Sequence, residues 1–117
     1  MFKIRKEFHF SASHCLEGLP KEHPCSNMHG HNYVVTVELS THLVDKVGFV
    51  TDYRALEPIK KYIDETLDHK HLNDVLTINP TAENIAQHLF HKFAREFPFL
   101  CAVEVSETEK TSARYEP

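Results

Sequence analysis

The sequence predicts an α+β fold, an antiparallel sheet with two helices packed on one face, in the order ββααββ. Two stretches near the start and two near the end alternate apolar with polar residues, which is typical of half-buried strands. Between them, two stretches repeat apolar residues at helical spacing. Helices that follow one another between pairs of strands are expected on one face of the sheet.

The first two strands are expected over residues 2–14 and 29–43. In both, most apolar side chains share one parity and most polar ones share the other, so one face points to the core. His14 falls on the apolar parity of the first strand, and His29 and His31 fall on that of the second. The alternation therefore predicts that three imidazoles face the interior.

Two helices are expected between the strand pairs, the first after an N-cap at Thr51 or Asp52. Pro58 lacks an N–H group and clashes inside a helix, so we expect a distorted first turn or a later start. The apolar stripe of this helix is Leu56, Ile59, Ile63 and Leu67. The second helix is expected between an N-cap at Thr81 and Pro98. Its stripe is Ile85, Leu89, Phe93 and Phe97.

The last two strands are expected over residues 99–108 and 112–115. The inward face of the first carries Cys101, Val103 and Val105. Glu107 continues this parity, so a carboxylate faces inward and needs hydrogen-bond donors. Parity alone favours a salt bridge to an arginine or lysine of the chain. The alternative partner is the guanidine-like edge of a heterocyclic ligand.

Size and composition favour a single cytoplasmic domain with a small-molecule partner. The 117 residues suffice for one core, over residues 1–117. The formal net charge of −4 argues against nucleic acid or an anionic membrane as partner. No apolar run is long enough to cross a bilayer, and the start alternates charge with apolar residues, unlike a signal peptide. The cysteines, Cys15, Cys25 and Cys101, are expected to be free thiols.

The chain has 10 histidines, and the His-Gly-His segment at 29–31 is the strongest local signal among them. Residues i and i+2 of a strand face the same side, so both imidazoles can bind one metal ion. The alternative is a pair of hydrogen-bonded core histidines. His14 joins the pair if the two strands form a hairpin. Three histidines suit a catalytic zinc with an open position, whereas Cys15 or Cys25 as fourth ligand would make a structural site.

Candidates for proton chemistry are Cys25, four residues before His29, and the adjacent pair Asp68 and His69. A divalent cation lowers the pKa of a nearby thiol and makes thiolate available as a base, whereas the alternative is an ordinary loop cysteine. A carboxylate beside an imidazole suits a proton relay, although both residue types are common at helix ends. The other six histidines are expected at the surface: His9, His23, His42, His71, His88 and His91.

Five segments together resemble the 6-pyruvoyl-tetrahydropterin synthase family, in the family's order and over almost the whole chain. They are Phe10-Ser11-Ala12-Ser13-His14, Cys25-Ser-Asn-Met-His29-Gly-His31-Asn-Tyr, Leu67-Asp68-His69-Lys-His-Leu-Asn73, Pro80-Thr81-Ala-Glu83-Asn84 and Glu107-Thr108. The gap of three residues between Cys25 and the His-Gly-His segment resembles the 6-carboxy-tetrahydropterin synthase branch of queuosine biosynthesis. The pyruvoyl-forming branch typically has a longer gap. Lys70 departs from the histidine that some carboxy synthases carry there.

The resemblance implies the tunnelling fold, with subunits joined edge to edge as a homohexamer of two trimers. This also answers the problem of open sheet edges. The implied zinc ligands are His14, His29 and His31. The implied catalytic residues are Cys25 as proton-transferring base, Asp68 and His69 as proton relay, and Glu107 as anchor of the pterin ring. Thr81 and Glu83 are implied contacts of the substrate.

The implied activity is that of a zinc-dependent lyase. It converts 7,8-dihydroneopterin triphosphate to 6-carboxy-5,6,7,8-tetrahydropterin, acetaldehyde and triphosphate in queuosine (7-deazaguanine) biosynthesis. One alternative is 6-pyruvoyl-tetrahydropterin synthase, which eliminates triphosphate without cleaving the side chain. The non-enzymatic alternative is a structural zinc or ligand-binding module. The sequence does not show which basic residues bind the triphosphate. The candidates are Lys21, Arg54, Lys70 and Lys110.

Overall fold

One sheet with helices packed on it makes up the fold, which the computed structural model describes for residues 1–117. The strands are β1 (Phe2–His14), β2 (His29–Thr41), β3 (Lys70–His71), β4 (Leu100–Thr108) and β5 (Thr111–Tyr115). The helices are α1 (Glu57–Tyr62), α2 (Leu72–Val75) and α3 (Ala82–Phe93). None of these helices has the length and apolar character needed to cross a membrane.

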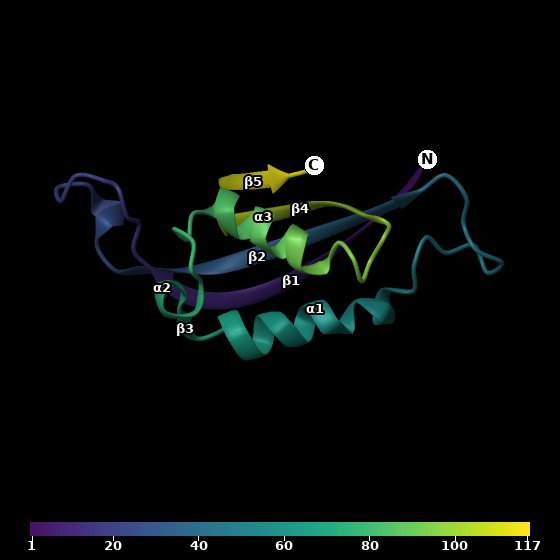
Figure 1. Cartoon of the computed structure of the whole chain (residues 1–117), viewed down its shortest axis with the longest axis horizontal. Coiled ribbons are helices and arrows are strands. Elements are labelled where there is room, and N and C mark those ends of the chain that lie inside the picture. Colours follow the sequence, from purple (N-terminus) through teal and green to yellow (C-terminus); the bar gives the residue numbers. More distant parts are fainter.

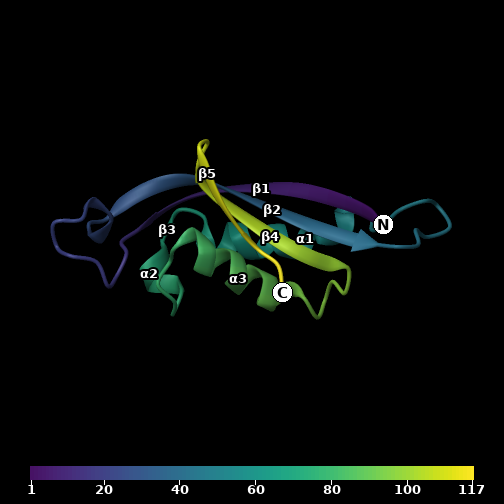
Figure 2. The same cartoon turned by 90° about the horizontal axis from the view of Figure 1, so that it is seen from above.

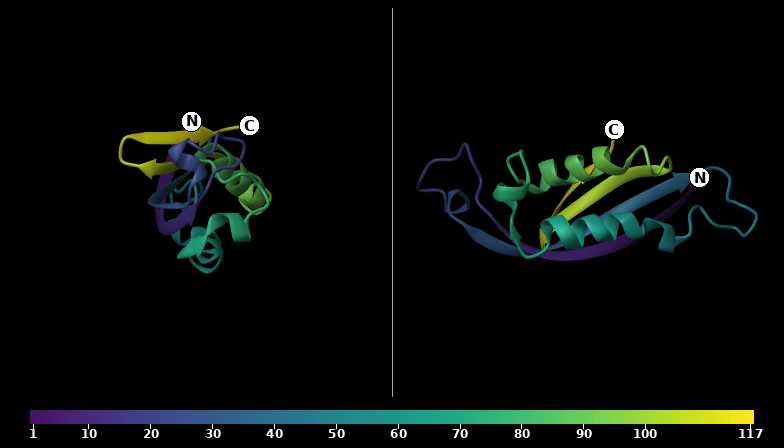
Figure 3. Two further views of the ribbon diagram at one scale, coloured as in Figure 1. Left: turned by 90° about the vertical axis from the view of Figure 1, so that its left-hand side faces the viewer. Right: turned by 60° about the horizontal axis from the view of Figure 1, so that its bottom comes forward.

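The elements form two layers in an elongated molecule of 56 × 25 × 25 Å (Figure 1). The sheet has the strand order β3-β1-β2-β4-β5. Seen from above, α1 and α3 lie on the same side of the sheet, and no helix covers its other face (Figure 2). The right-hand view of Figure 3, with the bottom of the molecule turned forward, shows α1 and α3 side by side in front of the strands. The predicted α+β arrangement is therefore confirmed, with β3 and α2 as additions too short to show a period. The sheet is not wholly antiparallel as expected, because β3 pairs parallel with β1.

The hairpin of β1 and β2 is the longest feature of the sheet. Its two strands pair antiparallel from Phe2 opposite Thr41 to His14 opposite His29. The loops that follow the two strands project at opposite ends of the molecule (Figure 1). β2 ends at Thr41, two residues earlier than expected, because the Thr41 hydroxyl oxygen accepts a hydrogen bond from the N–H of Leu43. Leu43 is 83% exposed and adds nothing to the core.

The first helical segment shows the predicted distortion around its proline. Asp52 caps a 3₁₀ turn over Tyr53–Leu56, and α1 begins only at Glu57. Pro58 lies in the first turn of α1, where a missing N–H group costs nothing. A π-helical turn over Ile63–Leu67 completes the segment and keeps the predicted apolar stripe buried.

The second predicted helix, α3, begins as expected and ends early. The Thr81 hydroxyl oxygen accepts a hydrogen bond from the N–H of Asn84 at 3.1 Å, which confirms the N-cap. The helix ends at Phe93, and the chain continues as a turn over residues 94–96 ahead of Pro98. Phe97 nevertheless remains buried against the core.

A register shift between β2 and β4 changes the position of one predicted core residue. Glu38 opposes Ala102 and Leu39 opposes Leu100, so Cys101 is an extra residue on β4, as in a β-bulge. The Cys101 thiol lies 3.4 Å from the backbone oxygen of Glu38 and 3.6 Å from its carboxylate. The prediction that Cys101 faces the core with Val103 is therefore wrong, because the bulge reverses its side.

An ion pair between a buried glutamate and a partly exposed arginine links β5 to β2 on the face that has no helix. The Glu38 side chain is 9% exposed and lies on β2. Arg114 of β5 donates to both of its carboxylate oxygens, at 2.8 and 3.3 Å. The hydrogen bonds from Arg114 are the main reason why the pKa of Glu38 lies below its ordinary value. The pair therefore stabilises the fold in the charged state.

Replacing this carboxylate gives a test of the pair. We expect Glu38→Gln to lower the free energy of unfolding by roughly 1–2 kcal/mol at neutral pH, because Arg114 loses charge-assisted hydrogen bonds. Since folding depresses the pKa of Glu38, its contribution is present above about pH 4.3 and is lost as the pH falls below that value. Urea unfolding at several pH values measures the difference. Glu116→Gln, which removes the more exposed partner of Arg114, is the control, and equal losses for both variants would contradict the account.

Candidate active site

Strand register brings the three predicted metal-ligating histidines together. His14 on β1 opposes His29 on β2, and Ala12 opposes His31. The ring centroids of the three imidazoles lie 4.5, 4.9 and 5.0 Å apart. One nitrogen from each ring lies within 4.8 Å of the others, and no cysteine belongs to this cluster. The cluster therefore offers three imidazole ligands and lacks the sulfur of the structural-zinc alternative.

Backbone carbonyls fix the tautomers of two of these rings. Nδ1 of His14 donates to the oxygen of Pro80 at 2.7 Å, and Nδ1 of His29 donates to the oxygen of Asn27 at 2.8 Å. A carbonyl only accepts, so the proton is on Nδ1 and a lone pair is left on each Nε2. The two Nε2 atoms face each other at 3.0 Å. Burial also lowers the pKa of His14 and so favours the neutral form that binds metals.

The third ring provides the test of whether a metal fits. Nε2 of His31 is buried and has no hydrogen-bond partner. Together with the lone pairs on Nε2 of His14 and of His29, this atom makes a set of three nitrogens that can each donate an electron pair. No atom of the chain binds all three. A divalent cation that favours imidazole, such as zinc, satisfies all three at once. The residues present therefore fit the metal that the sequence predicts.

Glu107 lies beside this cluster. Its carboxylate is 3.6 Å from Nε2 of His31, and its side chain is one-quarter exposed. The inward position predicted from parity is confirmed. The expected salt bridge to an arginine or lysine is wrong, because the same parity places Glu107 among the histidines and its only ionic contact is His31. Its exposed part is left free for another partner.

Asp68 and His69 are fastened to the outer edge of β1 by Ser11. The N–H of Ser11 donates to Oδ1 of Asp68 at 2.9 Å, and the N–H of His69 donates to the oxygen of Ser11 at 2.7 Å. The Ser11 hydrogen bond is the main cause of the lowered pKa of Asp68. Oδ2 of Asp68 lies 2.8 Å from Nδ1 of His69. His69 has a φ of 57°, a strained value for a residue other than glycine, and its side chain is 81% exposed.

Cys25 does not join the histidines within the chain. It lies half-buried in a 3₁₀ turn over Pro24–Ser26. Its backbone oxygen accepts a hydrogen bond from the N–H of Leu16 at 2.8 Å. The loop that carries the thiol is thus tied to the chain two residues beyond His14, without contact between the thiol and the cluster.

Two asparagines that the sequence analysis did not single out hold this loop at its base. The side-chain amide of Asn73 accepts from the N–H of Cys15 at 3.0 Å and donates to its oxygen at 2.8 Å. Asn79 makes the same pair of bonds to Glu17, at 2.9 and 3.1 Å. Leu16, which bonds Cys25, lies between the two anchored residues. No periodicity indicates such contacts, because they join residues 58 and 62 positions apart in the sequence.

The remaining predicted residues have ordinary structural contacts. Thr81 is the cap of α3, and the exposed Glu83 shares a hollow of about 200 Å³ with Glu107. Two histidines expected at the surface are half-buried, because His71 bonds the hydroxyl of Ser13 and His88 bonds that of Tyr62. Burial lowers the pKa of His88. The other four histidines expected at the surface are exposed: His9, His23, His42 and His91.

A sheet that is antiparallel apart from the short β3, two helices on one of its faces and a cluster of three histidines agree with the pterin synthases of the tunnelling fold. Residues 3–117 match the profile of the family described as 6-pyruvoyl tetrahydropterin synthase, and the chain belongs to this family. The 6-pyruvoyl tetrahydropterin synthase of Caenorhabditis elegans superposes with a TM-score of 0.87 at 29% identity, over 99% of this chain and 95% of that chain. The predicted tunnelling fold is therefore confirmed.

Relatives of similar sequence have names from both branches of the family. The 6-carboxy-5,6,7,8-tetrahydropterin synthase of Rickettsia felis is 33% identical, over 76% of this chain and 78% of that protein. The enzyme of the same name from Haemophilus influenzae is 30% identical over 99% of both chains. The 6-pyruvoyl tetrahydrobiopterin synthase of Dictyostelium discoideum is 33% identical, over 78% of this chain and 72% of that protein. The chain is thus similar to pterin synthases along nearly its whole length.

Removal of one imidazole tests the metal site. The protein should bind about one zinc ion per chain, and His29→Ala should weaken zinc binding by more than the roughly 100-fold that loss of an outer-shell partner costs. Competition with a chelator and metal analysis of the purified protein measure both quantities. His9→Ala, which removes an exposed imidazole from the same hairpin, is the matched control. Unchanged zinc affinity in His29→Ala would overturn the assignment.

The role of the asparagine contacts is tested by measuring the stability and mobility of the loop, because zinc binding should not depend on them. We expect Asn73→Ala to lose roughly 1–2 kcal/mol of stability and to speed amide hydrogen exchange over residues 15–28, because both bonds to Cys15 disappear. Zinc content should stay the same, since no ligand changes. Asp74→Ala, an exposed neighbour on α2, controls for loss of the helix itself. Faster exchange spread evenly over the chain would count against a local anchor.

Proposed function

We propose that the chain is a zinc-dependent 6-carboxy-5,6,7,8-tetrahydropterin synthase of queuosine biosynthesis. Its substrate would be 7,8-dihydroneopterin triphosphate, and with water its products would be 6-carboxy-5,6,7,8-tetrahydropterin, acetaldehyde and triphosphate. The observation that carries the proposal is the unpartnered Nε2 of His31, which completes a set of three nitrogen donors directly beside Glu107. Relatives named 6-carboxy-5,6,7,8-tetrahydropterin synthase support the branch.

The metal and the pterin would bind on adjoining groups. Zinc held by His14, His29 and His31 would supply Lewis acidity, which makes a proton on the substrate side chain easier to remove. Glu107 would accept two hydrogen bonds from the guanidine-like edge of the pterin, since its carboxylate has no arginine or lysine partner. Thr81 and Glu83 extend this part of the site in the proposal, and Glu83 shares a hollow with Glu107.

Cys25 would act as the base that takes this proton, and His69 would move protons on the opposite side of the substrate. Asp68 would hold the His69 imidazole through its 2.8 Å contact with Nδ1, which leaves Nε2 free to exchange a proton. Ser11 fixes the backbone of this pair. The strained φ of His69 supports a functional role, because such strain persists where a site requires it.

The proposal includes assembly into a homohexamer of two trimers. Two sheet edges have little or no partner within the chain: β5 at one side and the part of β1 that the two-residue β3 does not cover. Such edges favour pairing with further copies. Assembly would also bring Cys25 and His69 of different copies to one site, since within one chain neither Cys25 nor His69 belongs to the histidine cluster. The free thiols agree with a cytoplasmic setting.

The alternative activity is that of a 6-pyruvoyl-tetrahydropterin synthase. The Dictyostelium relative is named 6-pyruvoyl tetrahydrobiopterin synthase. Incubation of the zinc-loaded protein with 7,8-dihydroneopterin triphosphate separates the two. We expect acetaldehyde and 6-carboxy-5,6,7,8-tetrahydropterin in equal amounts with triphosphate, detected by liquid chromatography and mass spectrometry. Triphosphate release without acetaldehyde would assign the pyruvoyl activity instead.

A variant without the Cys25 thiol distinguishes a catalytic zinc site from a structural one. Cys25→Ala should retain its zinc and lose turnover by roughly 100-fold or more, because a general base contributes about that factor. Cys101→Ala, which removes a thiol on the helix-free side of the sheet, is the matched control and should keep full activity. Loss of zinc in Cys25→Ala would favour the structural-zinc alternative.

A further inference from the structure

The hairpin of β4 and β5 turns without the backbone geometry that so short a turn normally has. Only Glu109 and Lys110 lie between the two strands. Hairpin turns of two residues usually have a positive φ at one or both positions, because this conformation matches the right-handed twist of the strands. His69 is the only residue other than glycine with a positive φ, so this turn lacks the match. The strands beside the turn therefore have to take up the difference in twist.

A bulge directly before the turn takes up this difference. The register of β4 against β5 shifts between Val105 and Thr108. Within the shift, Ser106 and Glu107 of β4 oppose the single Ser112 of β5. An extra residue of this kind bends the strand and changes the direction of the side chains that it carries. The direction of Glu107 therefore depends on how the bulge is held.

The hydroxyl of Ser106 holds the bulge from the face of the sheet that has no helix. Ser106 pairs with Val34, whose neighbour Tyr33 is buried in the core beneath the helices. Paired residues share a face and successive residues alternate, so Ser106 points away from the helices. Its hydroxyl donates to the backbone oxygen of Thr111 at 2.8 Å and also bonds that of Thr108. One side chain thus ties both strands together where the bulge disturbs the ladder.

The threonine hydroxyls of this hairpin close the turn and do not reach the bulge. The hydroxyl oxygen of Thr108 accepts from the N–H of Lys110 at 3.2 Å. It also lies 3.1 Å from the hydroxyl oxygen of Thr111. Ser106 is therefore the residue whose side chain connects the bulge to the far side of the turn.

We propose that Ser106 is a positioning residue for the carboxylate of Glu107. The inference rests on the proposed function, in which this carboxylate anchors the pterin ring. Glu107 lies between Ser106 and Thr108, so the bonds of the Ser106 hydroxyl fix the backbone on both sides of the glutamate. Because Ser106 faces away from the helices, it acts through the backbone and not by contact with the pterin.

Few other contacts set the direction of the Glu107 side chain. Its carboxylate has no arginine or lysine partner, and its only ionic contact is with Nε2 of His31 at 3.6 Å. In the proposed metal centre this nitrogen is a zinc ligand, so the backbone is the main support that the carboxylate retains. A displacement of about 1 Å in a group that positions a substrate can cost roughly 100-fold in rate. The hydroxyl of Ser106 is therefore expected to affect binding of the ring.

Two variants of equal shape test the hydroxyl in the purified, zinc-loaded protein. Valine and threonine both branch at Cβ, which suits a strand, and only threonine keeps the hydroxyl. We expect Ser106→Val to weaken binding of 7,8-dihydroneopterin at least tenfold by calorimetry, equivalent to about 1.4 kcal/mol. Ser106→Thr should stay within about threefold of the original protein, because the bond to Thr111 can form. Zinc content should be the same in both variants, since no ligand changes.

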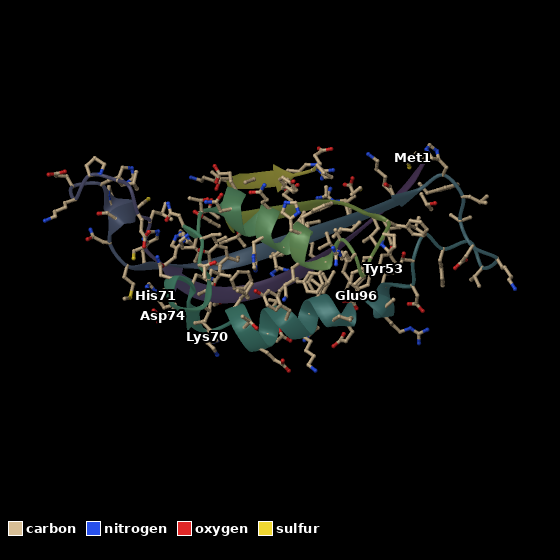
Figure 4. All side chains as sticks on the ribbon, in the orientation of Figure 1. Met1, Tyr53, Lys70, His71, Asp74 and Glu96 are labelled. Carbon is tan, nitrogen blue, oxygen red and sulfur yellow. The ribbon has the colours of Figure 1, made fainter.

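Ser40→Val is the matched control, the same substitution at the other end of the sheet. Ser40 pairs with Lys3, near the start of the chain. The histidine centre is at the opposite end, where Ser13 pairs with His71. Figure 4 shows Met1 and His71 at opposite ends of the molecule. We therefore expect Ser40→Val to bind 7,8-dihydroneopterin like the original protein.

Equal affinities for 7,8-dihydroneopterin in Ser106→Val and Ser106→Thr would overturn the inference. Loss of zinc from Ser106→Val, or no binding of 7,8-dihydroneopterin to the original protein, would also overturn it. The proposed function fails separately, through the absence of products from 7,8-dihydroneopterin triphosphate. Turnover with the same KM in both variants would keep the function and reject the positioning role. A KM at least tenfold higher in Ser106→Val than in Ser106→Thr would support both.

Discussion

Antiparallel pairing of β1 with β2 places His14 directly opposite His29 and two residue pairs away from His31, on the same face. Because side chains alternate between the two faces of a sheet, a slip of one residue would turn an entire strand over and send its imidazoles to the opposite face. The apolar residues of the same parity resist such a slip, since Phe8, Phe10 and Tyr33 would then leave the core. The packing that stabilises the hairpin therefore also aligns the metal ligands.

Residues that come later in the sequence hold the three-histidine cluster in place. Pro80 precedes the cap of α3 and orients His14, so the start of a helix and the end of a strand are coupled through one imidazole. Asn73 and Asn79 extend the same support to the loop that carries Cys25. Rigid partners of this kind fix ligand direction before a metal binds. The helical layer thus orients residues of the site in addition to covering the core.

The sequence predicted the parts of the site that follow from local periodicity. Strand parity was sufficient for His14, His29, His31 and Glu107, because a period of two decides which face each side chain occupies. Contacts that join distant segments left no such signal: Ser11 with Asp68, Asn73 with Cys15, and the partner of Glu107. The sequence pattern also contains no sign of the bulge at Cys101, since one extra residue changes parity without altering composition.

The central claim is that the three histidines form a metal centre without sulfur. X-ray absorption spectroscopy at the zinc edge of the zinc-loaded protein tests it most directly, because nitrogen and sulfur ligands differ in distance and scattering. The account predicts a shell with three imidazole nitrogens at about 2.0–2.1 Å, completed by a light atom from solvent. A sulfur at about 2.3 Å would contradict it, since Cys15 or Cys25 would then close the site.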